Sequence, residues 1–202
     1  MRLAVLERGH RLRARLFFAV ASRMAGGEQV DDVFKTILYR PALVGGPAFA
    51  TMIRGSLRGP SDWSVGEREL FAAATSQANA CTFCADIHSR TATLTLGSEV
   101  TPQIVEDAEH ADFRPEAKAM IRLIEKVSQY PDLVTKQDVD AVRAAEVSEA
   151  AIEDGLAICF AFNLINRLAD AFEYDWDNER HRSQGARALV RFGYRIPRYL
   201  MR

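Results

Sequence analysis

The residues of this chain that are best suited to chemistry are two cysteines and a histidine within eight positions. Cys81 and Cys84 lie three apart and His88 follows four later, in a chain with only three cysteines and four histidines. On a helix, positions separated by three, four and seven share one face, so His88 lies one turn from Cys84 and two turns from Cys81. A thiol pair beside an imidazole is suited to redox or nucleophilic chemistry.

Other uses of a C-x-x-C pair fit this sequence less well. A structural zinc site usually takes four ligands from two such pairs, and this chain has one pair. Haem attachment requires a histidine directly after the second cysteine, where this chain has Ala85. Two thiols that only pack remain the structural alternative. We therefore expect no metal and no cofactor, and a redox role for the pair.

An acid upstream reaches the cysteines only if the chain reverses. Glu69 lies twelve residues before Cys81, and one continuous helix would separate them by about 18 Å. A helix that ends near Ala78 and restarts with Asn79 as N-cap allows two helices to fold into a hairpin. Glu69 lies ten residues before Asn79 and His88 nine after it, so a tight antiparallel pair sets Glu69 opposite His88.

In this predicted pocket Cys84 is the nucleophile. The helix N-terminus and the neighbouring groups are expected to lower the pKa of Cys84 from about 8.5 towards neutrality. Cys84 then attacks a peroxide oxygen and becomes a sulfenic acid, which Cys81 traps as a disulfide. Glu69, through His88, is expected to take the thiol proton and later to help protonate the leaving alcohol.

These four positions, with Asn79 two residues before the first cysteine, resemble the signature of AhpD-like alkylhydroperoxidases of the carboxymuconolactone decarboxylase superfamily. The helical pattern over residues 163–172 (NLINRLADAF) is also similar, and the likeness spans roughly residues 30 to 175. One departure is Phe83, because some members have a histidine between the cysteines. This departure bears on proton delivery.

The resemblance implies an all-α fold, subunits assembled as trimers or hexamers, and reduction of a peroxide by the cysteine pair. Cys84 is peroxidatic and Cys81 resolving in this comparison, with Glu69 and His88 as a proton relay. An external dithiol, of the lipoyl or thioredoxin type, is expected to reduce the disulfide.

The elements that must position these residues are all predicted to be helices, because Ala, Leu, Glu and Arg dominate and apolar residues recur every three or four positions. Helix starts are predicted from capping residues at Ser64, Thr101, Pro115, Thr135 and Ser148. Breaks are predicted at 26–27, 41–47, 59–61, 97–98 and 130–132. Residues 1–202 are expected to form one AhpD-like bundle of about eight helices.

A weak internal repeat appears when the chain is shifted by 84 residues. Asn79 then meets Asn163, and residues 85–86 (AD) meet 169–170 (AD). This pattern would fit a duplicated helical hairpin with one functional copy, and chance agreement is the alternative.

Overall charge gives no sign of a nucleic acid partner, because the formal net charge is −1. Arginines concentrate in residues 1–30, expected as a basic N-terminal helix, and in a basic tail over residues 178–202. The apolar run at residues 16–21 (LFFAVA) is too short for a signal peptide, so we expect a cytoplasmic protein without a membrane partner.

Two rival functions stay open. One is a thiol–disulfide oxidoreductase with little peroxidase activity, and the other is a non-catalytic module whose cysteines sense redox state. Several further residues are expected to have structural roles: Cys159 in the core, Asp86 and Asp170 in exposed or inter-helix pairs, Trp63 and Trp176 in packing or interfaces, and His110 and His181 outside any constellation.

Overall fold

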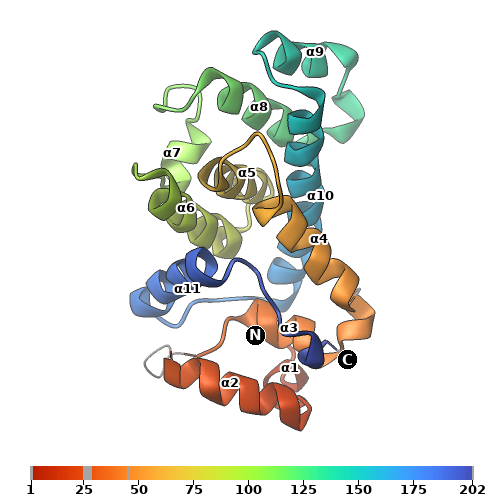
Figure 1. Cartoon of the computed structure of the whole chain (residues 1–202), viewed down its shortest axis with the longest axis vertical. Helices are drawn as coiled ribbons and strands as arrows, with labels where there is room; N and C mark the ends of the chain where they lie inside the picture. Colours follow the sequence, from red (N-terminus) through yellow and green to blue (C-terminus); the bar gives the residue numbers. More distant parts are fainter. Residues whose placement is uncertain (1, 25–28, 45, 202) are drawn as a thin grey trace.

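The computed structural model describes residues 2–24, 29–44 and 46–201, and every regular element in these ranges is helical (Figure 1). The α-helices are α1 (Val5–Arg8), α2 (Leu12–Met24), α3 (Asp32–Tyr39), α4 (Gly46–Arg58), α5 (Val65–Ala78), α6 (Thr82–Leu96), α7 (Pro102–Glu106), α8 (Pro115–Gln129), α9 (Lys136–Ala144), α10 (Glu149–Phe172) and α11 (Glu179–Phe192). Short 3₁₀ turns cover Pro41–Val44, Pro131–Leu133 and Arg198–Leu200. The all-α class is confirmed, and the helices beyond the expected eight include the one-turn α1 and α7.

Helix α5 lies in the middle of the fold. Figure 1 shows α4, α6, α7, α8 and α10 around it, and all five contact it. Residues 66–76 of α5 are buried without interruption. Full burial of side chains such as Leu70 and Phe71 contributes about 1.5–3 kcal/mol each. Any polar residue on α5 must therefore find its partners within the protein instead of in water.

The predicted helix starts are confirmed. Ser64 and Glu67 form a capping box at α5, Thr101 caps α7, and Ser148 accepts a hydrogen bond from the backbone N–H of Ala151 at the start of α10. The Asp138 carboxylate likewise accepts the Thr135 backbone N–H at α9, and Pro115 opens α8. Capping residues satisfy backbone N–H groups that have no partner within the helix, so they mark these starts reliably.

The two arginine-rich ends differ from the expectation of one helix and a tail. The N-terminal stretch forms two helices, α1 and α2, with a break at Gly9. A Cβ at Gly9 would come within 2.6 Å of the Tyr39 ring, so this close approach requires glycine. The predicted break at residues 26–27 lies outside the described residues. The C-terminal stretch contains α11, which packs against α6.

Helix α10 occupies the positions that the internal repeat would pair with the hairpin of α5 and α6. It starts after Ser148 as α5 starts after Ser64, 84 residues earlier, but it runs on to Phe172 without the turn that separates α5 from α6. The second half therefore does not repeat the hairpin. Among the described residues, α10 is the one helix with the length and composition to cross a membrane, and in this fold it packs against α4, α5 and α8.

Candidate active site

The site is built on the hairpin of α5 and α6, as the spacing predicted. The connection is short, and Ala80 adopts a left-handed backbone conformation with φ 57°. The expected N-cap was wrong: Asn79 caps the end of α5, and Cys81 is the N-cap of α6. The Asn79 amide is instead used between helices, because its Nδ2 donates to Oδ1 of Asn166 at 2.9 Å and of Asn163 at 3.2 Å.

Glu69 and His88 lie together, at the facing positions of the two helices. Oε2 of Glu69 is 2.7 Å from Nδ1 of His88. The Glu69 side chain is completely buried and His88 is nearly so. The reverse turn thus brings the predicted acid and imidazole into hydrogen-bonding contact.

Two further residues bind Glu69 and were not predicted from the sequence. Arg58, the last residue of α4, places Nη2 2.6 Å from Oε1 of Glu69. The hydroxyl of Tyr194, in the segment after α11, lies 2.9 Å and 3.0 Å from the two carboxylate oxygens and 3.4 Å from Nδ1 of His88. No spacing rule links these residues to Glu69, because Tyr194 is 125 positions away.

Electrostatics favour the ionised form of Glu69. Burial by itself raises the pKa of a carboxyl group, but the hydrogen bond and charge of His88, together with Arg58, outweigh burial and lower the pKa of Glu69. Burial and the Glu69 charge raise the pKa of Tyr194 well above its usual value. Tyr194 therefore keeps its proton and donates it in the hydrogen bond to the carboxylate.

Both cysteines are free thiols in this structure, and both are buried. A hydrogen bond with Cys81, followed by burial, raises the pKa of Cys84 well above its usual value, and a hydrogen bond with Asn166 offsets only part of this effect. The expectation of a lowered pKa for Cys84 was wrong. Although Cys84 lies in the first turn of α6, the second thiol and the loss of water outweigh the favourable helix terminus.

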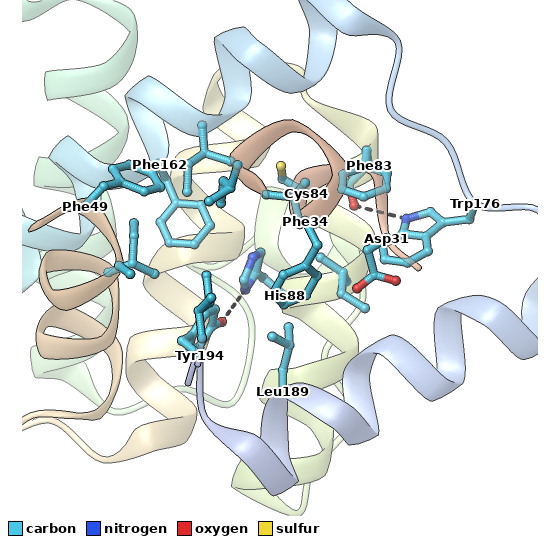
Figure 2. A pocket seen from close by; sticks show the side chains of 17 residues that line it. Asp31, Phe34, Phe49, Phe83, Cys84, His88, Phe162, Trp176, Leu189 and Tyr194 are labelled. Atoms are coloured by element: carbon cyan, nitrogen blue, oxygen red, sulfur yellow. Dashed lines mark hydrogen bonds between the residues drawn. The ribbon is translucent and has the colours of Figure 1, made fainter. Parts of the chain in front are cut away.

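A largely apolar cavity of about 80 Å³ adjoins these groups (Figure 2). Side chains from α3, α4, α6, α10, α11 and the segment after α11 line it, and the lining residues that carry polar side-chain atoms are Asp31, Cys84, His88, Trp176 and Tyr194. Cys81 is not among the lining residues. A small molecule in this cavity therefore meets Cys84 and the His88 ring and does not meet Cys81.

Comparisons with known proteins agree with this arrangement. A model of the carboxymuconolactone decarboxylase family matches residues 46–111. A solved alkylhydroperoxidase AhpD core, an uncharacterized peroxidase-related protein from Ralstonia eutropha JMP134, has a TM-score of 0.72 and 25% identity, over 88% of this chain and 92% of that one. In residues 46–111 and in its fold, the chain is similar to AhpD-like members of the carboxymuconolactone decarboxylase superfamily. No curated protein matches it.

A second solved structure shares the AhpD-like fold. It is an uncharacterized peroxidase-related protein from Silicibacter sp. TM1040, with a TM-score of 0.69 and 22% identity, over 84% of this chain and 87% of that one. The family model spans Arg58 and Glu69 as well as both cysteines and His88, whereas Tyr194 lies beyond it. The resemblance recognised in the sequence is confirmed at the level of the family.

The position between the cysteines is apolar in this AhpD-like chain. The Phe83 ring stacks on Trp176, with centroids 4.3 Å apart and planes 7° from parallel, and the Trp176 Nε1–H donates to the Phe83 carbonyl at 3.4 Å. Phe83 thus forms part of the cavity wall and supplies no proton. Trp176 has the packing role expected of it.

The other polar residues singled out in the sequence have structural partners. Asp86 accepts a hydrogen bond from Arg90 at 3.0 Å, and Cys159 is buried in the core. Asp170 acts on the site only through its charge, which adds to the raised pKa of Cys84. The Trp63 indole N–H donates to the Ala151 carbonyl at 2.7 Å.

The two other histidines singled out in the sequence differ in their surroundings. His110 pairs with Asp107 on the surface. His181 does have a constellation that the sequence did not indicate, because Asp31 and Asp177 lie 3.0 Å and 3.3 Å from its two ring nitrogens. Across residues 2–24, 29–44 and 46–201, no three His, Cys, Asp or Glu side chains are grouped to hold a metal ion.

Proposed function

We propose that this protein is a thiol-dependent peroxidase that reduces hydrogen peroxide or organic hydroperoxides through Cys84 and Cys81. The observation that supports the proposal is that Cys84 and His88 both line the cavity, and that Glu69 forms a hydrogen bond with His88. A peroxide in the cavity meets a nucleophile and a proton acceptor together, as general base catalysis requires.

The proposed first step consumes one peroxide. Because the pKa of Cys84 is raised, the thiol keeps its proton until a peroxide is bound, and His88 then accepts that proton. The Cys84 sulfur attacks the distal oxygen, the O–O bond breaks, and His88 returns the proton to the departing alkoxide. The products are an alcohol, or water from hydrogen peroxide, and a sulfenic acid on Cys84.

The proposed second step forms the disulfide. The Cys81 sulfur attacks the Cys84 sulfenic acid, an S–S bond forms, and the sulfenic oxygen leaves as water with the Cys81 proton. An external dithiol of the lipoyl or thioredoxin type then reduces the disulfide and is itself oxidised to a disulfide. The contact of Cys84 with Cys81 and the position of Cys81 outside the cavity lining support this division of roles.

We further propose a cytoplasmic homo-oligomer, a trimer or hexamer as the family resemblance implies, that needs no cofactor. Leu12, Leu16 and Val20 recur every four residues on α2 and are all exposed, which supports an association between subunits. Light scattering on the purified protein measures its mass and tests this part of the proposal.

The raised pKa of Cys84 is also compatible with one alternative function. A thiol–disulfide oxidoreductase with little peroxidase activity also uses a C-x-x-C pair, and it does not require a thiol that reacts quickly with peroxide. In that case the protein would reduce a disulfide substrate with a dithiol donor, and adding peroxide would consume no dithiol.

Stopped-flow measurement of peroxide consumption with dithiothreitol tests the proposal. We expect Cys84→Ser to abolish consumption, because the attacking sulfur is lost. In Cys81→Ser, one equivalent of peroxide should leave a sulfenic acid on Cys84, which dimedone traps. Cys159→Ser is the matched control and should keep wild-type turnover, since Cys159 lies in the core away from the cavity lining. Wild-type protein that consumes no peroxide would refute the proposal, and the reverse pattern in the two mutants would exchange the roles.

A further inference from the structure

Glu69 is surrounded only by hydrogen-bond donors. Its Oε1 meets Arg58 at 2.6 Å and Tyr194 at 2.9 Å, and its Oε2 meets His88 at 2.7 Å and Tyr194 at 3.0 Å. A proton on this carboxyl group would face another donor whichever oxygen carried it. Such a clash in a site closed to water disfavours the neutral acid.

The donors on Glu69 determine which nitrogen of His88 carries hydrogen. Because the carboxylate can only accept, the hydrogen between it and His88 belongs to Nδ1. The other ring nitrogen, Nε2, has no hydrogen-bond partner among the described residues, and the ring lines the cavity. His88 thus presents an unshared electron pair at Nε2, which is the form that accepts a proton from a thiol.

Arg58 and Tyr194 are themselves firmly held. The Arg58 guanidinium donates to the carbonyl of Leu57 at 2.8 Å and to that of Leu189 at 3.3 Å, and it lies 4.9 Å from the centre of the Tyr194 ring. The Tyr194 ring is nearly parallel to that of His88, and its backbone has a left-handed conformation with φ 62°. This conformation is unfavourable for a bulky residue and persists only where the surrounding contacts hold it.

We infer that Arg58 and Tyr194 are positioning residues, which hold Glu69 as an anion so that His88 keeps hydrogen on Nδ1 and acts alone as the base. This inference rests on the proposed peroxidase function, and it changes one part of the expected mechanism. Glu69 orients the imidazole and stabilises its charged form, but it does not receive the thiol proton. The C-terminal segment after α11 then belongs to the active site, although it lies beyond the match to the family model.

Removing either positioning residue should change how readily His88 becomes charged. With Arg58 present, part of the Glu69 charge is already compensated. Without Arg58, or without the Tyr194 hydrogen bond, more of that charge acts on the imidazole, so His88 takes up a second proton at a higher pH. Two other titratable groups have charge effects at this site: Cys84 on α6 acts on Tyr194, and Arg68 on α5 interacts with Arg58 and Glu69. On α10, Asp170 acts on Cys84 and Asp154 on Arg68.

Nitrogen NMR of the His88 ring tests the inference without any need for turnover. We expect the tautomer with hydrogen on Nδ1 in the wild type. In Tyr194→Phe and Arg58→Gln, we expect the midpoint of the His88 titration to move up by about one pH unit. Tyr199→Phe and Arg54→Gln are the matched controls, because both residues are exposed and have no contact with Glu69, and neither should shift the midpoint.

Kinetics provide the second measurement. The acid limb of kcat/KM for tert-butyl hydroperoxide should shift to higher pH in both variants, with a loss that approaches about tenfold well below the wild-type midpoint and near recovery at pH 9. If Arg58→Gln fails to fold by circular dichroism, Arg58→Lys retains a charge and should give a smaller shift.

Hydrogen on Nε2 in the wild type, or an unchanged midpoint in Tyr194→Phe, would overturn the inference. Loss of activity that only follows loss of folded protein would likewise reduce Tyr194 to a structural role. Wild-type protein with the expected tautomer and titration shifts but no peroxide turnover would refute the proposed function and leave the positioning roles intact.

Discussion

The buried Glu69 carboxylate depends on its neighbouring residues both for its stability and for its role in the site. A carboxylate with no exposure is unfavourable unless charge and hydrogen bonds compensate it, and here Arg58, His88 and Tyr194 do so. Removing its charge leaves the Arg58 guanidinium, whose side chain is 12% exposed, without an ionic partner. The group that organises the candidate site therefore also supports the fold.

Glu69→Gln tests this dual role. Because breaking a buried ion pair leaves one charge uncompensated, we expect the free energy of unfolding to fall by about 3 kcal/mol in urea denaturation at pH 7. The pKa of Glu69 is lowered in the folded state, so its contribution is present above the usual carboxyl value and is lost as the pH falls through the lower folded value. The difference between the two proteins should narrow below about pH 4.

Glu153→Gln provides the control for that measurement, since Glu153 is an exposed acid on α10 and its removal should leave stability nearly unchanged. Equal stability of wild type and Glu69→Gln at every pH would show that the ion pair between Glu69 and Arg58 contributes nothing to the free energy of unfolding.

At this scale the sequence predicted the positions that local spacing connects. Glu69 and His88 could be placed together because a turn of known place fixes where two helices face each other. Arg58 and Tyr194 could not, since arginines are common in this chain and only tertiary packing brings a distant tyrosine to the carboxylate. The raised pKa of Cys84 was also unpredictable, because it depends on the second thiol and on burial.

The hairpin of α5 and α6 is the element on which the site depends. At the end of the hairpin away from the turn, the two helices approach closely at Gly66. A Cβ there would lie 2.5 Å from Cγ and 3.0 Å from the backbone nitrogen of Leu96. The contacts with the Leu96 side chain are under 3.0 Å and force that side chain to shift, and the contact with the backbone nitrogen is tight as well. Gly66 therefore permits the close approach that brings Glu69, one turn further along α5, against His88.

Gly66→Ala should separate the helices and lower the free energy of unfolding by about 2 kcal/mol, with reduced peroxide turnover. Thermal unfolding measures the first effect and the stopped-flow assay the second. Gly55→Ala is the matched control, because nothing lies within 4 Å of a Cβ there and alanine favours the α4 helix, so stability should rise by up to about 1 kcal/mol. The same sign for both substitutions would contradict the packing argument.

Element boundaries were predictable where a side chain caps a helix and not where that side chain serves another partner. Ser64 and Ser148 mark the starts of α5 and α10 because their oxygens accept backbone N–H groups near the start of each helix. Asn79 has the residue type of an N-cap, yet its amide binds Asn163 and Asn166 on α10. A local sequence pattern does not reveal that a residue on a distant helix binds the side chain that would otherwise cap the helix.

The cavity is a property of the whole molecule. No single helix encloses it, since α3, α4, α6, α10, α11 and the segment after α11 all contribute side chains (Figure 2). Its volume of about 80 Å³ is near half of the roughly 150 Å³ that accommodates benzene in an engineered protein cavity. The size of the cavity should therefore limit which hydroperoxides reach Cys84.

We expect kcat/KM to be higher for tert-butyl hydroperoxide than for cumene hydroperoxide, and Phe49→Ala to narrow this ratio by about tenfold. Phe49 lines the cavity from α4, and its removal enlarges the space while costing about 3 kcal/mol of stability. Phe160→Ala, an exposed phenylalanine on α10, should leave the ratio unchanged. An unaltered ratio in Phe49→Ala would mean that peroxides approach Cys84 from elsewhere.

The long sequence distance between Glu69 and Tyr194 also has a consequence for biosynthesis. At translation rates of about 5–20 residues per second, the tyrosine is made roughly 6 to 25 seconds after the glutamate. During that interval the nascent hairpin of α5 and α6 can form, but its carboxylate lacks one of its donors and the cover of the later segment. The Glu69 carboxylate therefore loses its contact with water late in biosynthesis. A nascent chain that is stalled before Tyr194 would expose the polar groups between α5 and α6 that the complete protein buries.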